Sequence, residues 1–500
     1  MLLASVVTAS AEVGATRSRK AKISTLSAVV RAAERDEVPV VVSWLAGALP
    51  QGRIGTGWRT LAKHRTAAAQ TPSLTVAEVD SALTALAGAT GAGSTARRGA
   101  LVTELLGRAT QPEQQFLIGL LTGELRQGAL AGVMTEAVAV ATGVPVDAVR
   151  RAAMLSGSLP DTAAAATGGG TEALAGFGLE VGRGVSPMLA SPAEDIVSAV
   201  EELGDVSVEF KLDGARIQVH RDGPDVRVFT RTLRDITAAV PEIVELARSL
   251  PCTSVVLDGE TLALTDAGRP RPFQETMSRF GAHEGEAALR PFFFDCLHLD
   301  GVDLLDEPLS HRRAVLADVA AGQLIPSLTS PTVDEAAQHL HAALDAGHEG
   351  VMVKALDSPY AAGRRGRAWQ KVKQSHTLDL VVLGAEWGYG RRTGLLSNLH
   401  LGARDPDGGD PIMVGKTFKG LTDALLAWQT EEFPRFERSR DAHAVYVRPE
   451  IVVEIELDGV QVSRRYPGGV ALRFARVLRY RPDKTAAEAD TIDVVRALVP

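Results

Sequence analysis

The segment Val206–His220, with the sequence VSVEFKLDGARIQVH, decides which fold the middle of the chain is expected to adopt. Apolar and polar residues alternate up to an Asp-Gly pair, which predicts a strand, a turn and a return strand. The first strand carries Glu209, Lys211 and Asp213 on its polar face, and the return strand carries Arg216, Gln218 and His220 on one face. A lysine is therefore expected beside two carboxylates and an arginine. Taken alone, the segment fits a solvent-exposed charged hairpin equally well.

Later segments combine charged or aromatic residues with apolar strands in the same way. They are VVLDGETLAL at 255–264, PFFFDCLHLDG at 291–301, HEGVMVK at 348–354, WQKVK at 369–373 and RPDK at 481–484. Each alone fits an ordinary amphipathic strand. Lysine usage sets them apart, because the chain has ten lysines against 43 arginines, and five lysines lie in the motif segments: Lys211, Lys354, Lys371, Lys373 and Lys484. Lysine retained in an arginine-rich chain indicates amine chemistry or point-charge phosphate binding.

The sequence changes character twice along its length. Helical spacing dominates up to about Ser156, and the glycine-rich stretch Gly157–Val185 has the composition of a linker. Alternating strands follow Pro187, with helices expected at Thr237–Ser249, Ser310–Ala321 and Val333–Ala346. Further strands are expected at Leu380–Leu383, Ile412–Val414 and Val445–Leu457, and this last region has the length of a small β-barrel such as an OB-fold. We expect domains at 1–170, 187–375 and 376–500, with a linker at 171–186.

Composition excludes several classes of protein. The 500 residues are 45% apolar and 23% charged, which is typical of a globular chain and not of a disordered or collagen-like one. Cys252 and Cys296 are too few for a disulfide framework or a four-cysteine zinc site, and they suggest a reducing compartment. No stretch approaches the length of about 18 uncharged apolar residues that a membrane span requires, and Met1–Ala11 lacks the basic start of a signal peptide.

Six segments, taken in order, resemble the covalent nucleotidyltransferases, and specifically the three-domain ATP-dependent DNA ligases of bacteria and archaea. The pattern is KxDG at 211–214 followed by Arg231, DGE at 258–260, FDxxxxDG at 294–301, EGVMVK at 349–354, WxKVK at 369–373 and RxDK at 481–484. The resemblance covers the chain from about Pro187 to its end. It implies a multidomain fold: an all-α N-terminal DNA-binding domain, an α+β adenylation domain and a C-terminal OB-fold. Leu378–Arg404 departs from the pattern.

The resemblance also implies a role for each motif residue. Lys211 matches the lysine that attacks ATP to give lysyl-AMP, since an amine can be made nucleophilic whereas arginine stays protonated. Glu209 is expected to contact the adenine edge, and Phe294 to stack on the base. The expected ribose, phosphate and nucleotide ligands are Arg216, Arg231, Glu260, Arg367, Lys371, Lys373, Arg481 and Lys484. Glu260 and Glu349 are the expected ligands of Mg²⁺ or Mn²⁺. The assignments of Arg365 against Arg367, and of Lys371 against Lys373, stay open.

The implied activity is the sealing of nicks in duplex DNA during replication, repair or recombination. AMP passes from the lysine to a 5′-phosphate, and a 3′-hydroxyl then displaces it. One alternative is an RNA ligase or an mRNA-capping guanylyltransferase, against which the helical N-terminal part argues. Another is a catalytically dead DNA-binding scaffold, against which the intact motif set argues. An NAD-dependent ligase would need a four-cysteine zinc module that two cysteines cannot supply.

The net charge of −8 argues against a nucleic-acid partner until it is resolved along the chain. Residues 1–100 carry +6, residues 351–400 carry +5 and residues 464–484 carry +6, whereas residues 201–350 carry −13. We expect the positive segments to face nicked double-stranded DNA through its backbone. We further expect a monomer without membrane contact, located in the cytoplasm with the nucleoid.

Overall fold

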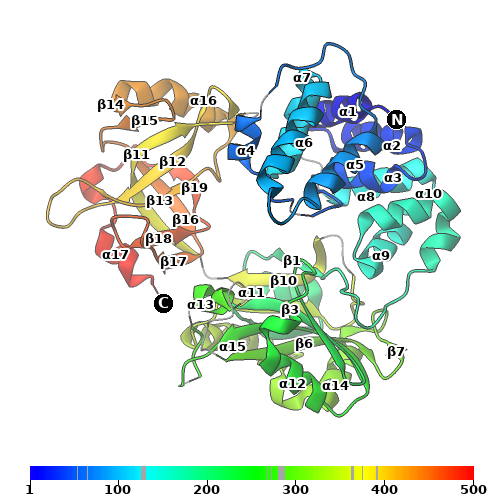
Figure 1. The fold of residues 1–500 in the computed structure, drawn as a ribbon. Coiled ribbons are helices and arrows are strands. Elements are labelled where there is room, and N and C mark those ends of the chain that lie inside the picture. The colour runs from blue at the N-terminus through cyan, green and yellow to red at the C-terminus, as the bar shows by residue number, and fades with distance from the viewer. Residues whose placement is uncertain are drawn as a thin grey trace. The chain divides into compact units, whose positions relative to one another are not determined.

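Three regions follow one another along the chain: a helical region, a mixed region with two sheets, and a strand-rich region (Figure 1). The computed structural model describes all residues except 53, 65, 126–130, 267, 272, 280–287, 362–364, 374, 390–391 and 500. The chain forms two compact units. The first comprises Met1–Ala193, Ser198–Val333 and Met352–Gln370, and the second comprises Glu194–Val197, Asp334–Val351 and Lys371–Pro500.

The first region is helical, as the residue spacing predicts. Its helices are α1 Leu3–Ala15, α2 Arg19–Ala32, α3 Val38–Leu45, α4 Trp58–Lys63, α5 Val76–Ala87, α6 Ser94–Arg108, α7 Gln111–Thr122, α8 Ala131–Thr142, α9 Val146–Ser156 and α10 Leu159–Ala175. Local sequence fixes where several of them begin. At α5, the Thr75 side chain accepts from the backbone N–H of Glu78, and the Glu78 carboxylate accepts in return, which forms a capping box. Leu26 and Val30, one turn apart on α2, are both buried in the helical core.

The stretch whose glycine content predicts a linker is largely helical. α10 begins after Ser158, whose side chain accepts a hydrogen bond from the N–H of Asp161, and runs to Ala175 with one non-helical residue, Gly170 (φ 58°). Alanine has the highest helix propensity, and Ala163 and Ala166 bury their side chains in the helical core. Composition alone therefore overestimated how strongly the glycines would break the helix, because only Gly170 interrupts it.

The mixed region contains two sheets. Its strands are β1 Leu189–Pro192, β2 Val206–Lys211, β3 Ala215–Asp222, β4 Asp225–Thr230, β5 Ser254–Ala263, β6 Leu289–Leu299, β7 Val302–Asp303, β8 Ser327–Thr329, β9 Gly350–Ala355 and β10 Arg365–Lys373. One sheet has the order β1-β10-β9-β2-β8 and the other β4-β3-β5-β6-β7. The helices are α11 Ile196–Leu203, α12 Pro241–Ser249, α13 Phe273–Ser278, α14 Leu309–Ala320 and α15 Val333–Asp345, with single 3₁₀ turns at Thr237–Ala239 and Ala321–Gln323. The three predicted helices are thus confirmed to within a few residues.

The expected hairpin over Val206–His220 is wrong. β2 and β3 belong to different sheets: β2 lies between β9 and β8, and β3 lies between β4 and β5. Both faces of β2 are covered, so Glu209 is buried instead of lying on a solvated face. The turn at Gly214 passes so close to β5 that a Cβ there would lie 2.5 Å from the carbonyl oxygen of Thr261. Alternation and an Asp-Gly pair cannot distinguish a hairpin from a strand that crosses between sheets.

The strand-rich region is built around β11. Its strands are β11 His376–Trp387, β12 Leu396–Ala403, β13 Ile412–Thr417, β14 Glu437–Arg440, β15 Ala444–Val447, β16 Val452–Leu457, β17 Gly459–Val462, β18 Val470–Arg473 and β19 Arg476–Tyr480. β11 pairs with β12 along one edge, and with β15 and then β16 along the other. α16 Asp423–Glu432 and α17 Ile492–Ala497 complete the region, together with 3₁₀ turns at Phe433–Phe436 and Ala486–Glu488. The stretch Val445–Leu457 forms two strands instead of one, because Pro449 lacks the N–H that a continuous ladder needs.

Each region has its own apolar core, and the cores consist mainly of aliphatic side chains. Among the described residues, no helix combines the length and the apolar character that crossing a membrane would require.

Candidate active site

Neighbouring strands place several predicted site residues close to the turn that follows Lys211. Lys211 is the last residue of β2 and is partly exposed. After the turn at Gly214, Arg216 on β3 lies opposite Glu260 on β5. Glu260 in turn lies opposite Phe292 on β6, two residues before Phe294. Because the turn at Gly214 packs against the backbone of β5 and the side chain of Glu260, the KxDG and DGE motifs meet at this point.

Arg216 is held in a buried network instead of pointing freely into solvent. Its Nε and Nη2 donate to the two carboxylate oxygens of Asp258 at 3.0 and 2.7 Å, and its Nη1 donates to the carbonyl oxygen of Met188 at 2.6 Å. The hydroxyl of Tyr360 donates to the same carboxylate at 2.7 Å. Burial opposes the charged guanidinium, but the Asp258 carboxylate raises the pKa of Arg216 above its ordinary value. The motif aspartate therefore orients the arginine.

Glu209 is fully buried and is bound by two cations. Its Oε2 lies 2.6 Å from Nζ of Lys354, and its Oε1 accepts from Arg313 and, at 3.1 Å, from the hydroxyl of Ser207. Two cations thus compensate one buried carboxylate. Since both cations face Glu209, this carboxylate does not depend on Lys211 for compensation.

Phe294 forms part of an aromatic box around Lys354. The Nζ of Lys354 lies 4.1 Å from the centroid of the Phe294 ring and 4.1 Å from that of Trp369, and the two rings meet edge to face at 6.0 Å. Phe294 is 8% exposed. Burial lowers the pKa of Lys354, and the neighbouring Glu209 opposes that shift. The predicted stacking residue thus lies next to a buried cation.

Asp295, beside Phe294, pairs with Arg312 of α14 in complete burial. Nε and Nη2 of Arg312 donate to its two carboxylate oxygens at 2.7 and 3.0 Å, and neither side chain is accessible to solvent. Burial raises the pKa of Asp295 even though Arg312 opposes the shift. This bidentate pair fixes the strand that carries Phe294.

Glu349 and Lys373, predicted to serve the metal and the phosphates, contact each other. Nζ of Lys373 lies 2.9 Å from Glu349 and 3.0 Å from Asp458, and Arg473 lies 3.8 Å from Glu349. Burial works against the charged ammonium, but Glu349 and Asp458 raise the pKa of Lys373 above its ordinary value. Gly350 (φ 141°) is needed here, because a Cβ would lie 2.2 Å from the carbonyl oxygen of Val372. Lys371, two residues away on β10, is partly exposed.

The RPDK segment lies directly after β19. Arg481 binds Asp379 of β11 at 3.0 Å and Asp483 at 2.7 Å, and Lys484 binds Asp379 at 2.5 Å. Hydrogen bonding to Asp483 and the charge of Asp379 raise the pKa of Arg481. Asp379 therefore gathers both motif cations within the strand-rich region.

The other two predicted arginines lie on the surface. Arg231 is exposed in the turn after β4. Arg367 of β10 forms an exposed ion pair with Glu202 of α11, and hydrogen bonding to Glu202 raises its pKa. The side chain of Arg365, the alternative to Arg367, lies outside the described residues.

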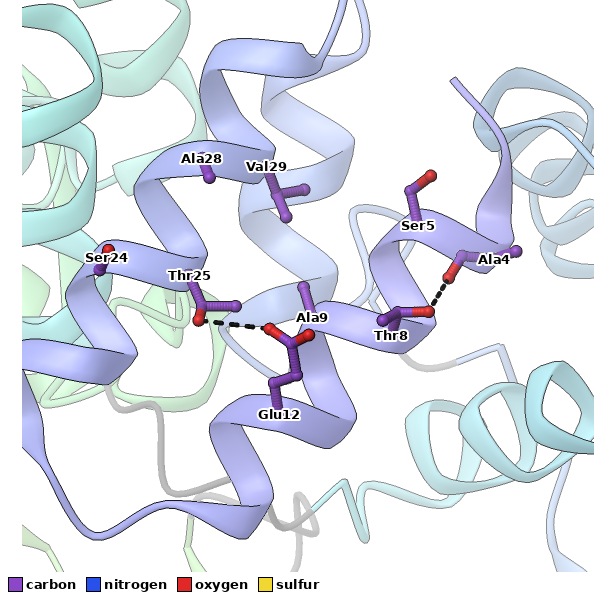
Figure 2. A pocket seen from close by; sticks show the side chains of 9 residues that line it. All are labelled: Ala4, Ser5, Thr8, Ala9, Glu12, Ser24, Thr25, Ala28 and Val29. Carbon is purple, nitrogen blue, oxygen red and sulfur yellow. Dashed lines mark hydrogen bonds between the residues drawn. The ribbon is translucent and has the colours of Figure 1, made fainter.

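No group of three or more histidine, cysteine, aspartate or glutamate side chains suited to a metal occurs among the described residues. A cavity of about 610 Å³ lies between α1 and α2 (Figure 2). It is lined by Ala4, Ser5, Thr8, Ala9, Glu12, Ser24, Thr25, Ala28 and Val29. Its only charged lining residue is a carboxylate, so this cavity does not suit a phosphate.

Comparison with known protein families explains the arrangement of motifs. Residues 187–373 match the ATP dependent DNA ligase domain, residues 49–139 match the DNA ligase N terminus, and residues 392–484 match the ATP dependent DNA ligase C terminal region. The chain belongs to the ATP-dependent DNA ligase family. A probable DNA ligase of Rhodococcus jostii (strain RHA1) is 68% identical and one of Rhodococcus opacus (strain B4) is 67% identical, each over the full length of both chains. The solved structure of Pmar-Lig_PreS3 shares the fold at 16% identity, with a TM-score of 0.63, over 95% of this chain and 99% of that one.

The residues that hold the motif side chains of the ligase in place were not predicted from the sequence. They are Asp258, Asp295, Arg312, Arg313, Tyr360 and Trp369, and Lys354 was noted without a role. A signal existed for four of them, because Asp258, Asp295, Lys354 and Trp369 lie inside motif segments. Arg312, Arg313 and Tyr360 had none, since they lie on α14 and in the loop after β9 and reach the site only through tertiary folding.

Proposed function

We propose that Lys211 is the nucleophile through which this ligase takes AMP from ATP and passes it to a 5′-phosphate at a nick in duplex DNA. The observation that supports this most is that Lys211 ends β2 where the KxDG turn packs against Glu260, with buried Glu209 two residues before it. In the first step, the neutral amine attacks the α-phosphorus, a P–N bond forms, the P–O bond to pyrophosphate breaks, and the amine proton leaves. Glu209 is already compensated by Lys354 and Arg313.

The remaining motif residues divide between the base, the sugar and the phosphates. We assign the adenine edge to Glu209 and the base face to Phe294, in keeping with the contact that each makes with Lys354. Ribose and phosphate contacts are assigned to Arg216, Arg231, Arg367, Lys371, Lys373, Arg481 and Lys484. Lys373 and Arg481 are bound to carboxylates in the structure, so binding ATP requires each to exchange its partner. An ATP phosphate would replace Asp458 on Lys373 or Asp379 on Arg481.

We propose Glu260 and Glu349, each as a separate candidate, for the carboxylate ligands of a divalent cation, Mg²⁺ or Mn²⁺. Mg²⁺ is usually held by one or two carboxylates together with water and substrate phosphates, so the lack of a larger ligand cluster in the described residues suits it. Glu260 is partly exposed on β5, and Glu349 is paired with Lys373. When bound, the cation would neutralise charge on the phosphates and the leaving pyrophosphate.

The second and third steps require duplex DNA, for which the strand-rich region offers a surface. Phe474 is 60% exposed with a strained backbone (φ 54°), and Lys419 lies 5.1 Å from its ring centroid. An exposed aromatic residue beside cations suits a nucleic-acid partner. We propose that this region, residues 376–500, is an OB-fold, that residues 187–375 are the adenylation domain, and that residues 1–170 bind DNA, with 171–186 joining them. A monomer acting with the cytoplasmic nucleoid is consistent with such a substrate.

The test of the nucleophile is incubation with α-labelled ATP and Mg²⁺, comparing wild type with Lys211→Ala. We expect covalent label on wild type and a loss of at least about a thousandfold in the variant, because no other group supplies the P–N bond. Lys416→Ala, a lysine of β13 outside the motifs, is the control and should keep the label. Equal label in wild type and Lys211→Ala would refute the assignment. Label from GTP instead of ATP would favour a guanylyltransferase, and no label in any variant would favour a scaffold.

The DNA-facing role of the basic N-terminal segment has a separate test. Arg17, Arg19 and Lys20 are exposed at the start of α2, although Arg19 pairs with Glu136 at 2.9 Å. Reversing all three to glutamate should weaken binding of nicked duplex about tenfold or more at low salt and reduce the salt dependence, because fewer counterions are released. Self-adenylation should stay unchanged. Unaltered DNA affinity would show that the DNA lies elsewhere.

A further inference from the structure

Lys354 differs from the other four motif lysines in its burial. It is 1% exposed, whereas Lys211, Lys371, Lys373 and Lys484 are all at least partly exposed. A buried ammonium is costly unless its surroundings compensate it. The chain uses arginine for the neighbouring buried pairs, Arg312 with Asp295 and Arg313 with Glu209, yet keeps a lysine here. A compact ammonium fits a space that a planar guanidinium does not.

The surroundings of Lys354 define that space. Its Nζ lies 2.6 Å from Oε2 of Glu209 and 4.1 Å from the centroids of both Phe294 and Trp369. One carboxylate and two aromatic faces therefore compensate the charge. Two of these three groups, Glu209 and Phe294, are the ones assigned above to the edge and face of the base. Lys354 contacts both, so it connects the two parts of the base site.

We propose that Lys354 is a positioning residue for base selection: it keeps the Glu209 carboxylate aligned beside Phe294, so that the site accepts a purine with a 6-amino group and rejects one with a 6-oxo group. This inference rests on the proposed function, because it takes the nucleotide and the assignment of Glu209 from there. It adds a residue that acts on the base through Glu209 without contacting the reacting atoms.

The selectivity follows from hydrogen-bond chemistry. An ionised carboxylate only accepts hydrogen bonds, whereas a protonated one can also donate. A 6-amino group donates to the ionised form, while a 6-oxo group would place two acceptors face to face in a buried site. With Lys354 removed, Arg313 alone remains on Glu209, and its contact is to Oε1. Oε2 would then lose its cation, so the carboxylate would turn toward Arg313.

The experiment compares three nucleoside triphosphates on one enzyme. Full-length wild type and Lys354→Met are incubated with α-labelled ATP, GTP or purine riboside triphosphate, which lacks the 6-substituent, and kcat/KM for covalent labelling is measured for each. Wild type should prefer ATP over the purine analogue by about tenfold or more, the value of one hydrogen bond to a charged group. In Lys354→Met that ratio should fall to within about twofold, and the preference for ATP over GTP should also shrink.

Ratios within one variant separate selection from general damage, because a partly inactive preparation lowers all three rates equally. Lys416→Met is the matched control, since it removes a lysine that pairs with a glutamate, Glu386, outside the motifs, and it should keep the wild-type ratios. If Lys354→Met does not fold, Lys354→Gln takes its place under the same criterion.

Two negative outcomes are distinguishable. Covalent labelling with an ATP-to-analogue ratio in Lys354→Met equal to that of wild type would overturn the role of Lys354 and leave the nucleophile assignment standing. Absence of covalent label on wild type with any of the three nucleotides would overturn the proposed function, and the role of Lys354 with it.

Discussion

Two glutamate–lysine pairs, one in the mixed region and one in the strand-rich region, differ mainly in their access to water. The side chains of Glu209 and Lys354 are 0% and 2% exposed, whereas those of Glu386 and Lys416 are 29% and 25% exposed. In the first pair, burial and aromatic walls make each charge depend on its partner. In the second, solvent screens both charges and can replace either partner. A glutamate–lysine pair can therefore serve the selection of a base or form an ordinary surface contact, depending on its burial and on the residues around it.

The comparison extends to the charged groups around each pair. In the mixed region, Asp295 and Arg312 are both inaccessible to solvent. In the strand-rich region, Arg479 pairs with Glu454 at 2.6 Å but is 66% exposed. The Asp295–Arg312 pair is thus closed to solvent, whereas the Arg479 guanidinium remains open to it.

The largest expected change in the free energy of unfolding follows from breaking the buried Asp295–Arg312 pair. Arg312→Met should lower the free energy of unfolding of the mixed region by about 3–5 kcal/mol, because the Asp295 carboxylate would stay buried without its cation. Arg479→Met is the matched control in the strand-rich region, where an exposed pair contributes about 0–1 kcal/mol. Urea unfolding followed by tryptophan fluorescence measures both. Equal losses in the two variants would contradict the distinction drawn between the regions.

The second expected effect is a loss of folding stability as the pH is lowered. His220 of β3 is buried, its Nδ1 accepts from the N–H of Gly182 at 3.1 Å, and burial lowers its pKa to about 3. In the unfolded chain the same imidazole takes a proton near pH 6.5, so the unfolded state gains protons first as the pH falls. His220 should therefore lower the free energy of unfolding by up to about 1.4 kcal/mol for each unit by which the pH falls between about 6.5 and 3.

The measurement for His220 is the free energy of unfolding against pH for wild type and for His220→Gln, which cannot titrate. The difference in slope between them should vanish above pH 7. His400→Gln is the comparison in the strand-rich region: burial also lowers the pKa of His400, but its hydrogen bond to Glu386 opposes the shift, so the change in slope should be smaller. A larger slope change from His400→Gln than from His220→Gln would reverse the order that burial predicts.

Much of the fold could be predicted from the sequence, and the reasons for the failures are physical. Helical spacing identified the first region, and motif order identified the family, because both are local patterns. The pairing of β2 was not predictable, since a period of two is the same for an edge strand and for a strand buried on both faces. The partners of Glu209 were equally hidden: Arg313 is more than a hundred residues away in sequence, and only tertiary folding brings it there. A motif can name the residue that does chemistry but not the groups that set its charge state.

The smallest expected change in stability concerns the partly exposed pair of Glu386 and Lys416. Burial acts in the opposite direction, but hydrogen bonds from Lys416, Asn398 and His400 lower the pKa of Glu386 from 4.5 to about 2. Its contribution to stability is therefore complete above about pH 4.5 and is lost as the pH falls toward 2. Because solvent reaches the pair, Glu386→Gln should cost only about 1 kcal/mol at pH 7 and nothing measurable at pH 2. Chemical unfolding of both proteins at the two pH values measures this difference, and a cost at pH 7 equal to that of Arg312→Met would mean that burial does not separate the two regions.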